Sequence, residues 1–216
     1  MQFDEVVHSR HSVRDFSDKP VDTELLKEIV RTAQASPSWG NSQPVHVHIL
    51  TGKAAQELRH IHLTSVEEHK QSHSDIAPMD RNRWPQWNQE VMAQWTVEFK
   101  KQFAPGQVHF SRAQKNLFNA PVFAFLTVPD KIFDWALFDA GAFANTLMLA
   151  AYDRGVDSIV AYSTVIFPDE IRALAHIPLN RKVVVGIALG YASADDINTF
   201  VPSRADVDDI LTIISE

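Results

Sequence analysis

The sequence predicts an α+β fold in which a mixed central β-sheet carries packed helices on both faces. Two segments, 121–128 and 183–190, are apolar at nearly every position, which is typical of strands buried on both sides. Segments of helical periodicity lie between the candidate strands without forming strict repeats. A third segment, 139–152, has no charged residue after Asp139, and a helix that is apolar on all sides must be buried.

Helices are predicted where apolar residues recur every three or four positions. Asp22 is the expected N-cap of the second helix, and Ser36 and Pro37 end it, because a residue before proline avoids the helical conformation. The fourth helix carries an apolar stripe made of Met92, Trp95, Phe99 and Phe103. In chain order the predicted helices are 2–8, 21–35, 54–62, 86–102, 139–152, 168–176 and 206–214.

Strands are predicted where side chains alternate in polarity or form a short apolar run. Apolar residues at Val45, Val47 and Ile49 alternate over the first strand. Gly155 is expected to cap the helix that precedes the third strand. The predicted strands are 45–51, 121–128, 157–162 and 183–190.

Length and composition favour one globular domain over residues 1–216, since 45% of the residues are hydrophobic and only 7 are glycine. The absence of cysteine excludes disulfides, thiolate metal sites and a cysteine nucleophile. The first residues do not resemble a signal peptide, and no apolar run is long enough to span a membrane, so we expect a cytoplasmic protein. A formal net charge of -7 argues against general nucleic-acid binding.

The segment 9–16 concentrates positive charge and hydrogen-bond donors in this acidic chain. Its sequence places Arg10, His11, Ser12 and Arg14 within five positions. Guanidinium groups match phosphate oxygens with two parallel hydrogen bonds, and a serine between them adds a neutral donor. The segment therefore predicts an anion site, although a solvated basic patch is the ordinary alternative for such residues.

Two further strings extend this pattern, namely Ser-Pro-Ser-Trp-Gly-Asn-Ser-Gln-Pro at 36–44 and the segment 198–204 that ends in an arginine. Together with the arginine segment they resemble the nitroreductase family of flavin mononucleotide (FMN) enzymes. The resemblance implies that the flavin phosphate is held by the N-terminal turn and the C-terminal arginine, and that the 36–44 loop approaches the flavin ring from a partner subunit. The residues so implicated are Arg10, His11, Ser12, Arg14, Pro37, Ser38, Trp39, Asn41, Gln43 and Arg204.

The resemblance also assigns parts of the chain that carry no family motif of their own. Asn116, Tyr162 and Ser163 stand at positions that border the flavin in the family, although many members have a Glu-Gly pair where this chain has Tyr162 and Ser163. The segment 54–111 corresponds to a helical insertion that shapes the substrate channel, with Trp84, Trp87 and Trp95 as its expected lining. The family implies a homodimer whose interface contains the buried helix.

The implied activity is the reduction of nitroaromatic, quinone or related conjugated acceptors with NADH or NADPH as hydride donor, in a ping-pong scheme. No side chain is assigned as a catalytic acid or base, because the flavin itself carries the chemistry.

Several alternatives remain open from the sequence. A non-catalytic flavin-binding or storage protein would use the same fold, and a flavin-consuming or reductively dehalogenating enzyme would belong to the same family. A metal-dependent hydrolase is a third alternative, because His46 and His48 share a strand face and His69 and His73 are spaced to share a helix face. Neither histidine pair belongs to a His-Glu-x-x-His motif, and phosphate-loop, dinucleotide-fingerprint and serine-hydrolase motifs are missing.

Overall fold

The computed structural model describes residues 1–131 and 134–215. Contacts divide the chain into two compact units. The first unit contains Met1–Ala77 and Phe110–Asn198. The second unit combines Pro78–His109 with the C-terminal segment that begins at Thr199.

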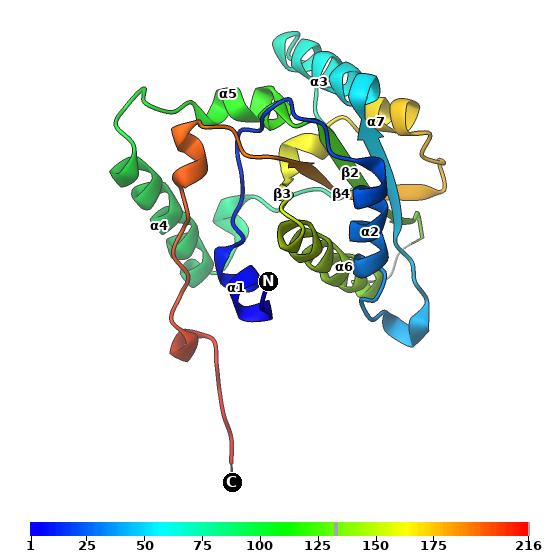
Figure 1. The fold of residues 1–216 in the computed structure, drawn as a ribbon. Coiled ribbons are helices and arrows are strands. Elements are labelled where there is room, and N and C mark those ends of the chain that lie inside the picture. Colours follow the sequence, from blue (N-terminus) through cyan, green and yellow to red (C-terminus); the bar gives the residue numbers. More distant parts are fainter. Residues whose placement is uncertain (132–133, 216) are drawn as a thin grey trace. The chain divides into compact units, whose positions relative to one another are not determined.

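The first unit is built on a four-stranded sheet with the order β1-β2-β4-β3 (Figure 1). Its strands are β1 His46–Thr51, β2 Val122–Pro129, β3 Asp157–Ala161 and β4 Arg181–Gly190. All three strand pairs are antiparallel, and the parallel pairing found beside them is an isolated bridge between Ser12 and Ser158. The α+β class is thus confirmed, and β1 and β3 are the two edges of the sheet.

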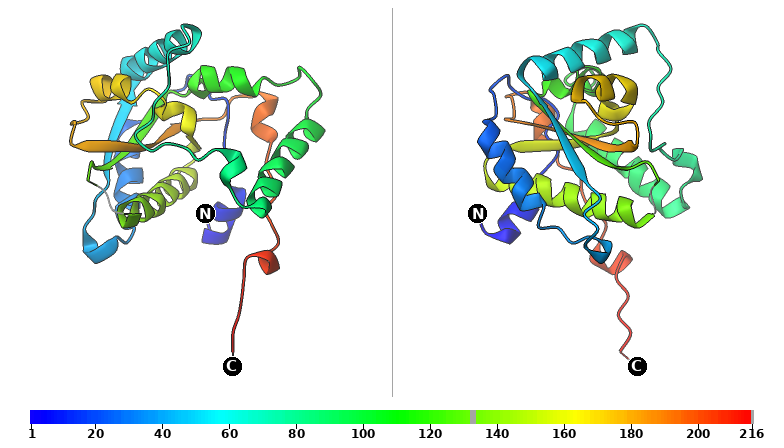
Figure 2. Two further views of the ribbon diagram at one scale, coloured as in Figure 1. Left: turned by 180° about the vertical axis from the view of Figure 1, so that it is seen from behind. Right: turned by 90° about the vertical axis from the view of Figure 1, so that its right-hand side faces the viewer.

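Helices cover both faces of this sheet, as predicted (Figure 2). Helices α2 Thr23–Ala33 and α6 Asp134–Asp153 pack on one face, and α3 Gly52–Glu67 and α7 Pro168–Ala175 pack on the other. The predicted cap of α2 is confirmed, because the Asp22 carboxylate accepts hydrogen bonds from the backbone N–H groups of Glu24 and Leu25 at 2.8 and 3.1 Å. The unit also contains α1 Phe3–Ser9 and α5 Phe110–Lys115, and α5 was not predicted.

The core lies between the sheet and the α2–α6 layer. Strand β2 is buried at every position except its last, as its continuous apolar sequence predicted. Helix α6 buries one face through residues such as Leu147 and Ala151, but Gly141 and Asn145 within the predicted segment are exposed, and Trp135 and Phe138 near the start of the helix are 59% and 67% exposed. Burial of α6 on all sides, which its sequence predicted, is therefore not achieved within one chain.

The second unit is centred on α4 Gln86–Gln102, whose bounds agree with the sequence prediction. The aromatic stripe of this helix forms a small core with Phe200. The ring of Trp95 stacks on Phe99 at a centroid distance of 5.3 Å, and both rings meet the edge or face of Phe200 at 5.4 and 5.1 Å. This unit also contains the short 3-10 turn η2 Arg81–Arg83.

The helix predicted over 206–214 is wrong. Residues Val207–Asp209 form one 3-10 turn capped by Asp206, and the described residues after Ile210 have no regular structure. Short helices depend on packing of an apolar face for their stability. Ile213 and Ile214 are 79% and 83% exposed, so the apolar periodicity of this segment has no surface to pack against in one chain. Across the described residues, no helix is both long and apolar enough to cross a membrane.

The free energy of unfolding is expected to fall between pH 6.5 and pH 4 because of His62 in α3. This side chain is 4% exposed and packs on the ring of Phe167, and burial lowers its pKa to about 4. The unfolded chain takes up this proton near the usual pKa of about 6.5, whereas the folded chain resists it. The contribution of neutral His62 to the free energy of unfolding is complete above pH 6.5 and is lost as the pH falls toward 4. At pH 5 this contribution is smaller by about 2 kcal/mol.

Urea unfolding at pH 7.5 and pH 5 measures this difference. The variant His62→Phe should lose about 2 kcal/mol less than the natural chain on acidification. The variant His60→Gln changes an exposed histidine of the same helix and should keep the natural pH dependence. If the free energy of unfolding falls equally with pH in His62→Phe and in the natural chain, His62 is not the source of the pH dependence.

Candidate functional site

The arginine segment lies against the outer side of edge strand β3. Ser12 forms the parallel bridge to Ser158, and the backbone N–H of Val13 donates to the carbonyl oxygen of Ser158 at 3.1 Å. Further along, the N–H of Phe16 donates to the carbonyl oxygen of Phe118 at 2.9 Å. The segment that carries the predicted anion-binding residues is thus fixed to the sheet at Ser12 and Val13, and to the turn at 117–119 at Phe16.

Asn198, which lies 184 positions from Arg14 in the sequence, holds the middle of this turn. Its Oδ1 accepts hydrogen bonds from the backbone N–H groups of Arg14 and Asp15 at 2.7 and 3.0 Å. Its Nδ2 donates to the carbonyl oxygens of Asp15 and Ser193 at 2.8 and 3.2 Å. No role could be predicted for Asn198 from the sequence, where it stands out only as the first residue of the segment that ends in Arg204.

The Arg14 guanidinium is 5% exposed, and its Nη1 donates to the carbonyl oxygen of Ser12 at 2.9 Å. Burial lowers the pKa of Arg14 to about 10, so the side chain remains charged at neutral pH. The predicted partners Arg10, His11 and Ser12 are half-buried beside it, and a ring nitrogen of His11 lies 3.1 Å from the carbonyl oxygen of Asn198. A charged group with so little water around it interacts strongly with an anion brought to the same place.

A left-handed turn supports the arginine segment from the other side. Leu117, Phe118 and Asn119 have φ angles of 46, 60 and 57°. Leu117 and Phe118 are bulky and buried, so this conformation costs energy and persists because the surroundings impose it. The Asn119 side chain donates to the carboxylate of Asp15 at 2.7 Å. The predicted residue Asn116 immediately precedes this turn and is half-buried.

Tyr162 and Ser163, predicted to border the flavin, lie at the far end of β3 in the turn η4 Tyr162–Val165. The Tyr162 hydroxyl is 3.0 Å from the hydroxyl of Ser74. The buried Oγ of Ser163 has no hydrogen-bond partner within the described residues, and the same holds for the Oγ of Ser158 on β3. Buried polar atoms in natural proteins nearly always have a partner, so these two hydroxyls could each bond a polar ligand.

Tight packing under η4 fixes this end of β3. A Cβ atom at Gly186 of β4 would stand 2.2 Å from Thr164 Oγ1 and 2.9 Å from Phe125 Cε1. Because no side chain can be accommodated there, only glycine lets the turn approach the sheet so closely.

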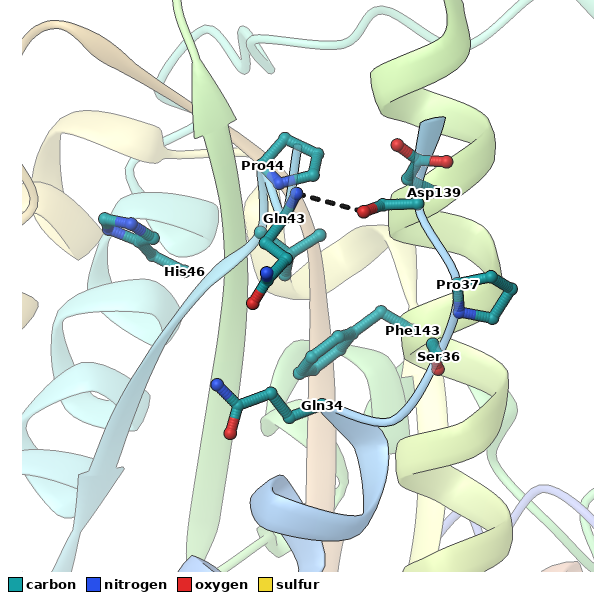
Figure 3. Close-up of a pocket in the computed structure, with 10 residues that line it drawn as sticks. Gln34, Ser36, Pro37, Gln43, Pro44, His46, Asp139 and Phe143 are labelled. Atoms are coloured by element: carbon teal, nitrogen blue, oxygen red, sulfur yellow. Dashed lines mark hydrogen bonds between the residues drawn. The ribbon is translucent and has the colours of Figure 1, made fainter. Parts of the chain in front are cut away.

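The Ser-Pro-Ser loop lies before β1 and is attached to α6. The N–H of Trp39 donates to both carboxylate oxygens of the buried Asp139 at 3.2 and 3.1 Å, and the Ser36 hydroxyl donates to Thr146 at 2.8 Å. The backbone N–H of Gln43 donates to Ser38 Oγ at 3.0 Å, which closes the loop on itself (Figure 3). A hollow of about 220 Å³ lies inside this loop, with Pro37, Ser38 and Gln43 in its wall.

The exposed surface of this loop is made of the predicted ring-binding residues. Trp39 is 65% exposed, and the Gln43 side chain donates to Asn41 Oδ1 at 3.2 Å. Asn41 and Gln43 have φ angles of 56 and 45°. Left-handed backbone at residues other than glycine is concentrated at functional sites, because the strain requires compensation elsewhere.

The arginine turn and the Ser-Pro-Ser loop are not brought together in one chain. The loop precedes β1 at one edge of the sheet, and the turn lies on β3 at the other edge, which is about 14 Å away across three strand spacings. The two also lie at different positions along the strands. His46 pairs with Thr127 of β2, whereas Ser158 is aligned through β4 with Val122 of β2, five residues or about 17 Å away.

The remaining predicted site residues belong to the second unit. The guanidinium of Arg204 is exposed and donates to the carbonyl oxygens of Pro202 and Ser203, both at 3.0 Å. Trp84 and Trp87 are 40% and 45% exposed, whereas Trp95 is packed in the aromatic core of this unit.

The histidines considered as metal ligands do not form the expected arrangement. His69 and His73 do not share a helix face, because α3 ends at Glu67 and His69 has a φ angle of 54°. His73 lies 3.1 Å from the carboxylate of Asp169. Burial lowers the pKa of His46 and His48, and the nearby Arg181 adds to this effect. Within residues 1–131 and 134–215, no three His, Cys, Asp or Glu side chains are grouped so that they could hold a metal ion.

Several proteins of known activity are similar to this chain in sequence. The 4-nitrobenzoate reductase of Pseudomonas putida is 30% identical over 195 residues, which cover 88% of this chain and 85% of that protein. The chloronitrobenzene nitroreductase of Comamonas testosteroni is 27% identical over 99% of this chain and 97% of its own length.

Among solved structures, the FMN-dependent nitroreductase NfnB from Mycobacterium smegmatis, in complex with NADPH, superposes with a TM-score of 0.89. It is 25% identical, and the match covers 98% of this chain and 97% of that one. A family model described as the Nitroreductase family matches residues 7–191. The resemblance noted in the sequence is confirmed, and this chain belongs to the nitroreductase family.

Proposed function

We propose that this protein is an FMN-dependent oxidoreductase that uses NADPH or NADH to reduce nitroaromatic, quinone or similar conjugated acceptors. The observation that carries the proposal is the buried, positively charged turn at β3, with Arg14 5% exposed at its centre. A buried cation is stable when a complementary anion shares its site, and the FMN phosphate is such an anion.

The residues on the edge strand fit FMN in chemistry and in extent. Arg10, Ser12 and Arg14 provide the phosphate donors near the start of β3, and Tyr162 and Ser163 follow its end. The four steps along the chain from Ser158 to Tyr162 span about 13 Å, which suits an elongated ligand lying along the strand. The partnerless hydroxyls of Ser158 and Ser163 offer polar contacts along this path.

When bound, FMN would supply the redox chemistry by exchanging two electrons with the nicotinamide nucleotide and with the acceptor. The chain itself would bind the phosphate through the arginine turn and present the Tyr162 ring and the Ser163 hydroxyl at the other end. One slot serving donor and acceptor in turn implies a ping-pong scheme. The predicted phosphate contact of Arg204 and the channel-lining role of Trp84, Trp87 and Trp95 stay predictions.

We further propose a homodimer whose sites each draw on both copies. The arginine turn and the Ser-Pro-Ser loop lie at opposite edges of the sheet, so both can contact one flavin only if the loop comes from a second chain. Trp39, Trp135 and Phe138, which are 59 to 67% exposed, lie on that loop and at the start of α6. Exposed aromatic residues of this kind favour an interface.

A visible spectrum tests the proposed activity. The purified protein should show flavin bands that bleach anaerobically with NADPH or NADH and return when nitrobenzene or a quinone is added. Bands that never bleach with either nucleotide would instead indicate the non-catalytic flavin-binding alternative. A colourless protein that FMN cannot reconstitute would contradict the proposal.

Mixing two defective chains tests the shared site. Homodimers of Arg14→Gln, and of a chain with Asn41→Ala and Gln43→Ala, should each retain little FMN. A heterodimer of the two, isolated with different affinity tags, combines one natural turn with one natural loop and should recover about half of the natural FMN content. A heterodimer of two differently tagged Arg14→Gln chains is the control and should recover none. Failure of the first heterodimer to regain FMN would contradict the exchange of the loop between copies.

A further inference from the structure

A hollow of about 510 Å³ lies in the second unit, between η2 and one face of α4. Gln89, Met92, Thr96 and Lys100 in its wall recur at helical spacing, so a single face of α4 forms its floor. This face extends over the eleven steps from Gln89 to Lys100, or about 16 Å along the helix. Arg81 and Asn82 of η2 also line the hollow.

The wall is held in place by one amide. Gln89 Nε2 donates to the carbonyl oxygens of Trp84 and Asn82 at 2.8 and 3.3 Å. These two bonds attach the backbone around η2 to α4. The position of η2 beside this face of α4 is thus fixed by hydrogen bonds, and the side chains of Arg81 and Lys100 that line the hollow are exposed.

The chemistry of the wall is cationic and apolar. Arg81 and Lys100 line it, no Asp or Glu among the described residues does, and the formal net charge of the whole chain is -7. Within the described part of the chain, neither cation takes part in an ion pair. Glu98 of α4 is engaged elsewhere, because its carboxylate accepts hydrogen bonds from Ser203. Met92 and Val97 provide apolar surface between the two cations.

We propose that this hollow binds an aromatic ring that carries an anionic group, with Arg81 and Lys100 recognising the anion and Met92 and Val97 contacting the ring. A wall of this composition suits such a ligand, because the arginine can form two parallel hydrogen bonds with the anion, the lysine adds a second positive charge, and the apolar side chains remove the ring from water. Two sources have this chemistry, namely a carboxylated aromatic acceptor and the adenosine 2′-phosphate portion of NADPH. The role of this hollow in turnover rests on the proposed function, whereas binding of the ligand to the hollow does not.

Calorimetric titration of the purified protein separates these sources. Benzoate represents the acceptor, with benzamide as its neutral counterpart, and 2′,5′-ADP represents the nucleotide, with 5′-AMP as its counterpart lacking the 2′-phosphate. At least one anionic probe should bind more tightly than its counterpart. Arg81→Gln and Lys100→Gln should each weaken it about 5-fold, as expected for exposed charge-assisted contacts.

Lys101→Gln is the matched control, because Lys101 is adjacent and exposed but does not line the hollow. It should leave the affinities unchanged. Preference for benzoate would assign the hollow to the acceptor, and preference for 2′,5′-ADP would assign it to NADPH. Equal affinities in the natural, Arg81→Gln and Lys100→Gln proteins, or no binding of either anionic probe, would overturn the proposal. The flavin spectrum is independent of these titrations, so failure here leaves the proposed function standing.

Discussion

Replacing Arg14 with glutamine is expected to weaken FMN binding about 100-fold, equal to about 2.8 kcal/mol. The guanidinium is 5% exposed at the centre of the turn on β3, where little water screens its interaction with a phosphate. Glutamine keeps a donor of similar reach but removes the charge and the second parallel hydrogen bond. The measurement is the FMN content after purification and the dissociation constant on reconstitution.

The same substitution should leave the folding of the FMN-free chain intact. Asn198 binds the backbone N–H of Arg14 and not its side chain, so this contact survives the change. The substitution loses the bond from Arg14 Nη1 to the carbonyl oxygen of Ser12, and such a bond contributes about 0.5 to 1.5 kcal/mol. Arg14→Lys should give intermediate affinity, and Arg31→Gln, at an exposed position of α2, should bind FMN normally. Stoichiometric FMN in purified Arg14→Gln would show that Arg14 does not hold the phosphate.

Replacing Asn198 with alanine is expected to lower the free energy of unfolding by about 3 kcal/mol and to weaken FMN binding as well. Its side chain forms four hydrogen bonds, two of them to the N–H groups of Arg14 and Asp15. Each such bond contributes about 0.5 to 1.5 kcal/mol, and unsatisfied buried groups add to the loss. Urea unfolding of the FMN-free protein measures the first effect, and reconstitution with FMN measures the second.

Two matched variants refine this prediction. Asn198→Asp keeps an acceptor for the N–H groups of Arg14 and Asp15 but places an oxygen against the carbonyls of Asp15 and Ser193, so it should also destabilise. Asn119→Ala removes a single bond to the Asp15 carboxylate and places alanine at a φ of 57°, so it should cost about 1 to 2 kcal/mol. A loss below 1 kcal/mol for Asn198→Ala would mean that other contacts hold the turn.

Elements with a strong local pattern could be predicted well from the sequence. Helix α4 was predicted with its observed bounds, because Met92, Trp95 and Phe99 mark one face clearly. Strand β2 was predicted within one residue from its apolar run and the proline before it. The side chains that define the pattern are buried in β2, and in α4 the rings of Trp95 and Phe99 pack on Phe200, so local periodicity and tertiary packing agree.

Elements whose conformation depends on distant partners could not be predicted. The pattern at 206–214 favoured a helix, yet its isoleucines have no surface to pack on, and only a 3-10 turn forms. The opposite holds for Leu117 and Phe118, whose identities disfavour the left-handed conformation that burial imposes on them. His69 and His73 were expected to share a helix face from their four-residue spacing, but α3 ends at Glu67 and His69 has a left-handed backbone.

The sequence by itself determined the α+β class, the nitroreductase family and the chemical character of the arginine turn and the Ser-Pro-Ser loop. These properties depend on residue identity and short spacing, which are written directly in the chain. Only the tertiary structure decided that the turn is held by Asn198, that Arg14 is buried, and that the turn and the loop lie at opposite edges of one sheet. The reason is that these contacts join residues more than a hundred positions apart, and their geometry is set by strand order and packing, which no local pattern encodes.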